Sequence, residues 1–159
     1  MPSRFVCFAL AFTLWACTPA KDSTDFNKEA VIIEVTQMFD NYHRDIQEKG
    51  LTAEFDYLYP SDDFFWVPPG YTSALTYDSV KTILEMNAKH FRKVEFHFDT
   101  LKIFPITNEM ANYSGIVSGT MEDTSMLKTK VAIIESGTII KRKDGWKLLC
   151  GQSANIPNE

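Results

Sequence analysis

The fold of this chain is decided by residues 128–153, which read KTKVAIIESGTIIKRKDGWKLLCGQS. Two runs rich in apolar and β-branched residues, 128–142 and 146–153, flank the dipeptide Asp144-Gly145. Asp-Gly between two such runs is typical of a tight hairpin turn. The stretch therefore predicts two antiparallel strands joined by a short turn.

Two more strands are expected before this hairpin. Val94, Phe96 and Phe98 alternate with polar residues, as in a strand with one buried face. The pattern continues to residue 106, and the apolar face changes near Thr100, which predicts a β-bulge. Residues 110–121 are expected to form the next strand.

The earlier part of the chain has the spacing of helices. Between residues 26 and 49, apolar residues recur every three or four positions, which predicts a helix with one buried stripe. Asp25 or Ser23 can cap its start, and Gly50 ends it. A short helix is expected over residues 52–58, with its first residue, a threonine, as the cap.

An apolar strand is predicted at residues 64–67, since Pro68-Pro69-Gly70 cannot continue a ladder. A third helix is expected from about residue 77 to residue 93. Helices gathered early and strands gathered late predict an α+β fold, with helices covering one face of an antiparallel sheet.

The strand over residues 128–142 is apolar on both faces at Val131 to Ile134 and at Ile139-Ile140. One face can pack on the helices, so the other face needs a cover as well. A second copy of the sheet is the simplest cover, and we expect a homodimer through the outer sheet face. The alternative is a small cluster covered by the C-terminal tail.

The N-terminus has the order of an export signal. Arg4 precedes an apolar run over residues 5–16, which is too short to cross a bilayer. The run ends in Leu14-Trp15-Ala16-Cys17, which resembles the lipobox of bacterial lipoproteins, where cleavage precedes a cysteine that then carries lipid. The alternatives are cleavage after Ala20 without lipid, or an uncleaved anchor.

These features predict a lipoprotein signal peptide over residues 1–16, lipidation at Cys17, a flexible tether over residues 17–25 and a folded domain over residues 26–159. The chain is expected to face the periplasm or the cell exterior, held to the membrane of a bacterial cell envelope by its lipid.

Cysteine and charge content narrow the function further. Cys7 lies in the signal peptide and Cys17 would be acylated, so Cys150 has no thiol partner and no disulfide is expected. The formal net charge is −5, and the basic run at 141–143 is short. Nucleic-acid binding requires a broad basic face and is not expected.

Three histidines, His43, His90 and His97, are scattered along the chain without the spacing of metal ligands. The chain also has no glycine-rich phosphate loop. Neither a metal nor another cofactor is therefore expected.

Three short motifs follow one another in the chain: Tyr59 to Asp63, Val67 to Gly70, and residues 143–153 with Asp-Gly, Trp-Lys and a terminal serine. In this order they resemble the nuclear transport factor 2-like superfamily, and within it the SnoaL-like proteins, over roughly residues 27–154. The resemblance implies a cone-shaped curved antiparallel sheet packed on about three N-terminal helices, with an internal pocket. Family members use such a pocket for isomerases, cyclases and dehydratases, or for ligand binding.

The chain also departs from this family at positions that carry chemistry. Val67 stands where ketosteroid-isomerase-like members have an aspartate base, and a valine cannot take a proton. Cys150 and Gln152 stand where many SnoaL-like relatives have histidines. No catalytic residue is therefore carried over from the resemblance.

The pocket of such a cone would be lined by the first helix, the first strand and the inward sheet positions. This predicts five ligand-binding residues: Tyr42, Trp66, Tyr113, Glu135 and Gln152. A carboxylate desolvated at Glu135 would have a raised pKa and could act as an acid or a base. Because Ser136-Gly137 follows it, the simpler interpretation is that Glu135 lies at a strand bend and points to water.

Three functions follow from these expectations. The first is binding of a small, largely apolar molecule in the cone pocket. The second is an isomerase or dehydratase that uses Glu135 as its base, with Tyr42 or Tyr113 stabilising an enolate. The third is a dimeric interaction module whose cone is filled by side chains such as Phe39 and Phe91.

Overall fold

The computed structural model describes residues 25–157, so the expected signal peptide and Cys17 lie outside the described part of the chain. The elements, in order, are α1 (Lys28–Lys49), the 3-10 helix η1 (Leu51–Tyr57), β1 (Phe65–Val67), α2 (Tyr77–His90), β2 (Phe91–Thr107), β3 (Met110–Asp123), β4 (Lys128–Arg142) and β5 (Gly145–Asn155). None of the described helices is long and apolar enough to cross a membrane.

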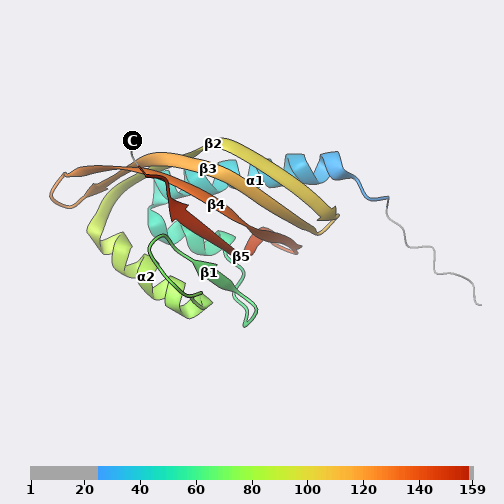
Figure 1. The fold of residues 1–159 in the computed structure, drawn as a ribbon, viewed down its shortest axis with the longest axis horizontal. Helices are drawn as coiled ribbons and strands as arrows, with labels where there is room; N and C mark the ends of the chain where they lie inside the picture. The colour runs from blue at the N-terminus through green and yellow to red at the C-terminus, as the bar shows by residue number, and fades with distance from the viewer. Residues whose placement is uncertain (1–24, 158–159) are drawn as a thin grey trace, which may run out of the picture.

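The strands form one curved sheet in the order β1-β5-β4-β3-β2. The four long strands are antiparallel neighbours, as expected, and they bend over the helices (Figure 1). The short strand β1 instead pairs with β5 in parallel, with Trp66 opposite Gly151. The sheet is therefore mixed, and the expectation of a purely antiparallel sheet is wrong at this edge.

The first helix begins at Lys28, two residues after the expected start, and it has a different cap. Asn27 accepts a hydrogen bond from the backbone N–H of Ala30 at 3.0 Å, so Asn27 and not Asp25 caps the start. Gly50 ends the helix with a φ of 89°, a left-handed value that suits glycine.

The other two helices differ from the prediction at their ends. The 3-10 helix η1 begins at Leu51, and no side chain caps it, so Thr52 does not have the expected role. Helix α2 ends at His90, three residues before the expected end. Phe91 already pairs with Asp123 in the sheet, and sheet pairing thus takes over from the helical pattern.

Two irregularities in the sheet decide which side chains point toward the helices. In β2 the register shifts between Phe98 and Thr100, where the sequence predicts a bulge. In β5 an extra residue, Leu149, lies between Leu148 and Cys150, while Ile139 and Thr138 opposite them are consecutive. This bulge exchanges the faces of the last part of β5.

The main core lies between the concave face of the sheet and α1. Val35, Phe39, Tyr113 and Ile139 are almost completely buried there. A second, smaller cluster of Ile46, Leu51 and Val94 closes one end of the sheet.

The outer face of the sheet is less apolar than the sequence suggests. Ile134 is 49% exposed and Phe104 is 54% exposed on this face, but Ser114, Ser136 and Thr138 lie among the outward positions of β3 and β4. The outer face therefore offers exposed apolar side chains within a polar surround, and the homodimer stays a prediction.

Candidate functional site

A pocket of about 160 Å³ lies beneath the sheet, between α1, η1, β1 and α2. A cavity of this volume is comparable to one that accepts a single aromatic ring. Its wall is made by Tyr42, His43, Glu54, Leu58, Phe64, Trp66, Val80, Phe96, Tyr113, Val117, Ile133, Glu135, Leu148 and Ser153. The pocket is thus largely apolar, with two carboxyl groups and a few hydroxyl groups.

Glu135 lies on the inner face of β4, because Ile133, Glu135 and Gly137 alternate regularly along this strand. Its Oε1 accepts a hydrogen bond from the hydroxyl of Tyr113 at 3.2 Å. The interpretation of Glu135 as a residue at a bend pointing to water is therefore wrong. Burial raises the pKa of Glu135 to about 7, against the opposing effect of the Tyr113 hydrogen bond.

Gly137 makes this arrangement possible without bending the strand. A Cβ at residue 137 would lie 2.4 Å from the carbonyl oxygen of Cys150 and 3.1 Å from the ring of Tyr113. The glycine therefore makes room for the tyrosine whose hydroxyl reaches Glu135.

A second carboxyl group, Glu54, joins the pocket from η1, and the sequence analysis missed it. Burial raises its pKa to about 7, a hydrogen bond from Tyr42 lowers it, and the negative charge of Glu135 raises it. The pocket therefore contains two glutamate–tyrosine pairs whose carboxyl groups influence one another. A short helical segment with no periodic pattern gave no sequence signal for this residue.

Both tyrosines in these pairs remain protonated donors at neutral pH. Burial, followed by the nearby charges of Glu54 and Glu135, holds the pKa of Tyr42 and that of Tyr113 well above the ordinary range. Tyr113 is also fixed in place by Phe39, whose ring centroid lies 4.6 Å away.

His43 also lines the pocket, although the sequence gave no reason to place it there. Burial, together with the charge of His97, lowers the pKa of His43 to about 4. The imidazole is therefore neutral at pH 7, and it contributes no positive charge to the pocket.

Four of the five residues predicted to line the pocket do so: Tyr42, Trp66, Tyr113 and Glu135. Gln152 does not, because the bulge at Leu149 turns its side chain to the outer face. It is exposed there and lines a shallow groove with Phe65 and Cys150.

Ser153 takes the inward position that Gln152 was expected to have. It is 9% exposed, it lines the pocket, and it lies directly opposite Glu135 in the sheet register.

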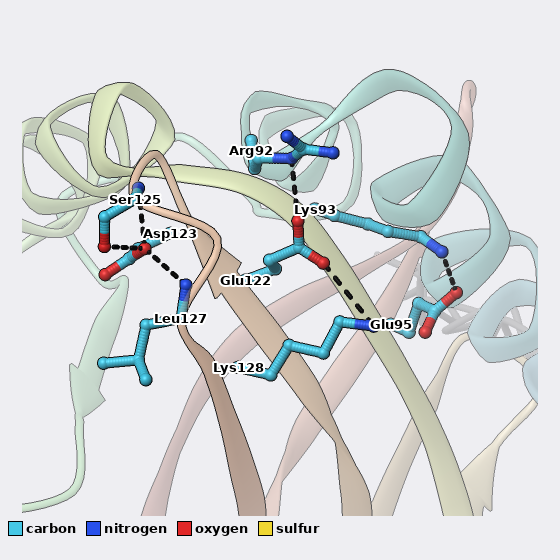
Figure 2. A network of polar contacts seen from close by, with 8 residues as sticks. All are labelled: Arg92, Lys93, Glu95, Glu122, Asp123, Ser125, Leu127 and Lys128. Carbon is cyan, nitrogen blue, oxygen red and sulfur yellow. Dashed lines mark hydrogen bonds and ion pairs between the residues drawn. The ribbon is translucent and has the colours of Figure 1, made fainter.

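The most buried carboxylate elsewhere in the described part of the fold is held by cations. Glu122 is 8% exposed and lies between Arg92, at 2.9 Å, and Lys128, at 3.6 Å (Figure 2). The same view shows Glu95 paired with Lys93. No lysine or arginine lines the pocket in the described part of the chain, and neither pocket glutamate has an ion pair there.

This arrangement is suited to proton transfer. Two interacting carboxyl groups with pKa values of about 7 hold a proton between them at neutral pH, so one can serve as a base and the other as an acid. Across residues 25–157, no group of three or more potential ligands could hold a metal ion.

No protein-family model and no curated protein sequence matches the chain. Solved structures do match. A nuclear transport factor 2-like superfamily protein from Salmonella enterica has a TM-score of 0.69 at 15% identity, with 83% of this chain and 95% of that chain covered.

Two further matches carry names of reactions. A proposed scytalone dehydratase from Novosphingobium aromaticivorans has a TM-score of 0.68 at 15% identity over 80% of this chain and 85% of that chain. A hexachlorocyclohexane dehydrochlorinase has a TM-score of 0.63 at 9% identity over 80% and 86%. At these identities the likeness concerns the fold alone, and the chain therefore has an α+β cone fold like that of the nuclear transport factor 2-like structures.

Proposed function

We propose that this chain is an enzyme of the isomerase or dehydratase type, which takes a small, largely apolar molecule into the cone pocket and uses Glu135 as its base. The observation that carries the proposal is the contact between Glu135 and the hydroxyl of Tyr113 inside an apolar pocket. A pKa of about 7 suits a general base that works near neutral pH.

The proton movements are simple to write. The ionised Glu135 takes a proton from a carbon next to a carbonyl group, and the hydroxyl of Tyr113 or Tyr42 donates a hydrogen bond to the enolate oxygen that forms. In an isomerisation, Glu135 returns the proton to another carbon. In a dehydration, protonated Glu54 gives its proton to the departing hydroxyl group, so that water leaves and Glu135 retains the abstracted proton.

The fold neighbours agree with this type of reaction. One is named as a proposed dehydratase and another as a dehydrochlorinase, and both names denote eliminations. Because each shares no more than 15% identity with this chain, their names support a reaction type only. The class of substrate has to be inferred from the residues that line the pocket.

Exchange of carbon-bound protons tests the proposal across a panel of candidate substrates. Small ketones and β-hydroxy ketones of single-ring size are incubated with the protein in D₂O, and NMR follows the loss of the α-proton signal. We expect Glu135→Gln to reduce exchange by about 100-fold or more, and Gln152→Ala, on the outer face, to leave it unchanged. Exchange that survives in Glu135→Gln would show that Glu135 is not the base.

The pH dependence gives a second measurement. The exchange rate should rise as pH increases through about 7, because only ionised Glu135 accepts a proton. If the reaction is a dehydration, the rate of water loss should fall again at higher pH, because Glu54 must remain protonated.

Binding without chemistry is the second candidate function. It is favoured by the five aromatic side chains in the wall: Tyr42, Phe64, Trp66, Phe96 and Tyr113. Saturable ligand binding with no proton exchange would select this candidate. A filled cone is disfavoured by the pocket volume, and Phe39 and Phe91 do not line the cavity.

We also propose the cellular context predicted from the sequence. Cys17 would carry lipid, the folded domain would stand in the bacterial cell envelope on a short tether, and two copies would pair through the outer sheet face. Exposed Ile134 and Phe104 support the pairing, and the order of charge and apolar residues over residues 1–17 supports the lipid anchor.

A further inference from the structure

The pocket carries negative charge that the protein does not neutralise. Glu54 and Glu135 face the cavity without an ion pair, whereas Glu122, which is 8% exposed, has Arg92 at 2.9 Å. Desolvated carboxylates without a counter-ion are costly, and the cost falls when a positive group occupies the site. The cavity therefore lacks a positive group, and a positively charged ligand could supply it.

The remaining wall has the groups that favour an organic cation over a metal ion. Aromatic rings attract a positive charge through the negative potential of their faces, most strongly in a desolvated site. Trp66, Phe64 and Phe96 line the same pocket and supply such rings. A hydrated metal ion would gain nothing from these apolar walls, whereas the carbon body of an organic molecule would pack on them.

Ser153 supplies a third polar contact at the same place. The residue is 9% exposed, lines the pocket and lies opposite Glu135 in the register. A serine hydroxyl that faces the cavity can accept a hydrogen bond from a ligand. An ammonium group has three N–H donors, which matches two carboxyl groups and one serine hydroxyl.

We propose that the natural ligand of the pocket is a small organic cation, with its ammonium group held by Glu54, Glu135 and Ser153 and its apolar body against the aromatic wall. This inference rests on the proposed use of the pocket for a small molecule, and it names the class of that molecule. An ammonium substrate would also keep Glu135 ionised, as a base must be. Because it would ionise Glu54 as well, this class of ligand fits the isomerisation and not the dehydration that needs protonated Glu54.

Binding of a cation should release protons. The titratable groups that face the pocket are Tyr42 and His43 from α1, Glu54 from η1, Tyr113 from β3 and Glu135 from β4, with Cys150 close to Tyr113. Both glutamates have a pKa of about 7. A bound ammonium group favours the ionised forms of both glutamates. At pH 7 the two glutamates together hold about one proton, so each binding event should release about one proton.

The test compares two probes of the same shape. Benzylammonium and neutral benzyl alcohol are titrated into the protein by calorimetry in phosphate and in Tris, whose different ionisation enthalpies report proton release. We expect benzylammonium to bind at least about tenfold more tightly than benzyl alcohol and to release about one proton. Benzyl alcohol should release none.

Variants assign this preference to the pocket. Glu54→Gln should weaken benzylammonium binding by about tenfold or more and change benzyl alcohol binding by less than about twofold. Glu109→Gln removes the same charge from an exposed turn and should change neither. Retained binding of benzyl alcohol shows that a variant is folded with an intact pocket.

Equal affinity for the two probes, absence of proton release, or failure of both probes to bind would each overturn the cation assignment. None of these results would decide the proposed function, because the proton-exchange experiment tests it separately. Loss of proton exchange in Glu135→Gln together with equal probe affinities would support the proposed enzyme but reject an organic cation as its ligand.

Discussion

The same chemical change, glutamate to glutamine, should have opposite effects on stability at two buried positions. Glu135 faces the pocket without a cation, whereas Glu122 lies between Arg92 and Lys128. Glutamine keeps the size of the side chain and an oxygen that can accept the hydrogen bond of Tyr113. The comparison therefore isolates the charge.

The magnitude at Glu135 follows from its pKa. An ordinary value of 4.5 rises to about 7 in the folded protein. Since a tenfold change in proton affinity is worth about 1.4 kcal/mol, the ionised carboxylate destabilises the folded state by about 3 kcal/mol relative to the protonated one.

The sign follows from the direction of this shift. The folded state binds the proton more tightly than the unfolded state, so stability falls as pH rises from about 4.5 to about 7 and stays low above that. Glu135→Gln removes this loss. It should stabilise the protein by about 3 kcal/mol at about pH 8.5 and have little effect at about pH 4.

Glu122→Gln should act in the other direction. It leaves Arg92 and Lys128 without their common partner, but both cations are more than half exposed, so we expect a loss of only about 1 kcal/mol at neutral pH. Urea denaturation of the parent and both variants at the two pH values measures these free energies. If Glu135→Gln, like Glu122→Gln, destabilised the protein at high pH, the account of Glu135 as an unpaired, desolvated carboxylate would be refuted.

Three further predictions concern the pocket wall, the outer sheet face and the N-terminus. Gly151→Ala should lower the free energy of unfolding by about 2 kcal/mol or more, measured in urea, because its Cβ would lie 2.4 Å from the ring of Trp66; an unchanged midpoint would contradict this close packing. Ile134→Lys should convert a dimer to a monomer in light scattering, whereas Ile33→Lys, at an exposed apolar position on α1, should not; a monomeric parent protein would exclude the pairing. Cys17→Ala should abolish lipid attachment in mass spectrometry and move the chain from the membrane fraction to the soluble fraction, and a lipidated Cys17→Ala product would contradict the assignment.

The strands could be predicted from the sequence because period-two alternation and the Asp144-Gly145 turn are local signals. The face of Gln152 could not be predicted, since counting by two from Trp146 puts Gln152 inward, and only the extra residue Leu149 reverses the count. Glu135 was misjudged for a related reason. A glycine after a carboxylate suggests a bend, but here Gly137 makes room for a neighbouring ring.

Glu54 shows a different limit. It lies in a seven-residue 3-10 helix without a side-chain cap, and its role comes from contact with Tyr42 and proximity to Glu135, which are distant in the chain. Such pairings arise from tertiary structure, and no local pattern reveals them. Two aromatic residues could be assigned to the pocket wall from the sequence because they lie on elements that the sequence predicts. Tyr42 lies on the first helix and Trp66 on the first strand.

The edge strand β2 has a consequence for how copies of this chain meet. A free edge of 17 residues would be a template for strand addition and amyloid growth if it were flat and regular. Its pairing with β3 shifts register at three places, and Pro105 removes one backbone donor near its end. These interruptions make intermolecular hydrogen bonding along the edge discontinuous, so crowded copies are protected from polymerising sheet to sheet.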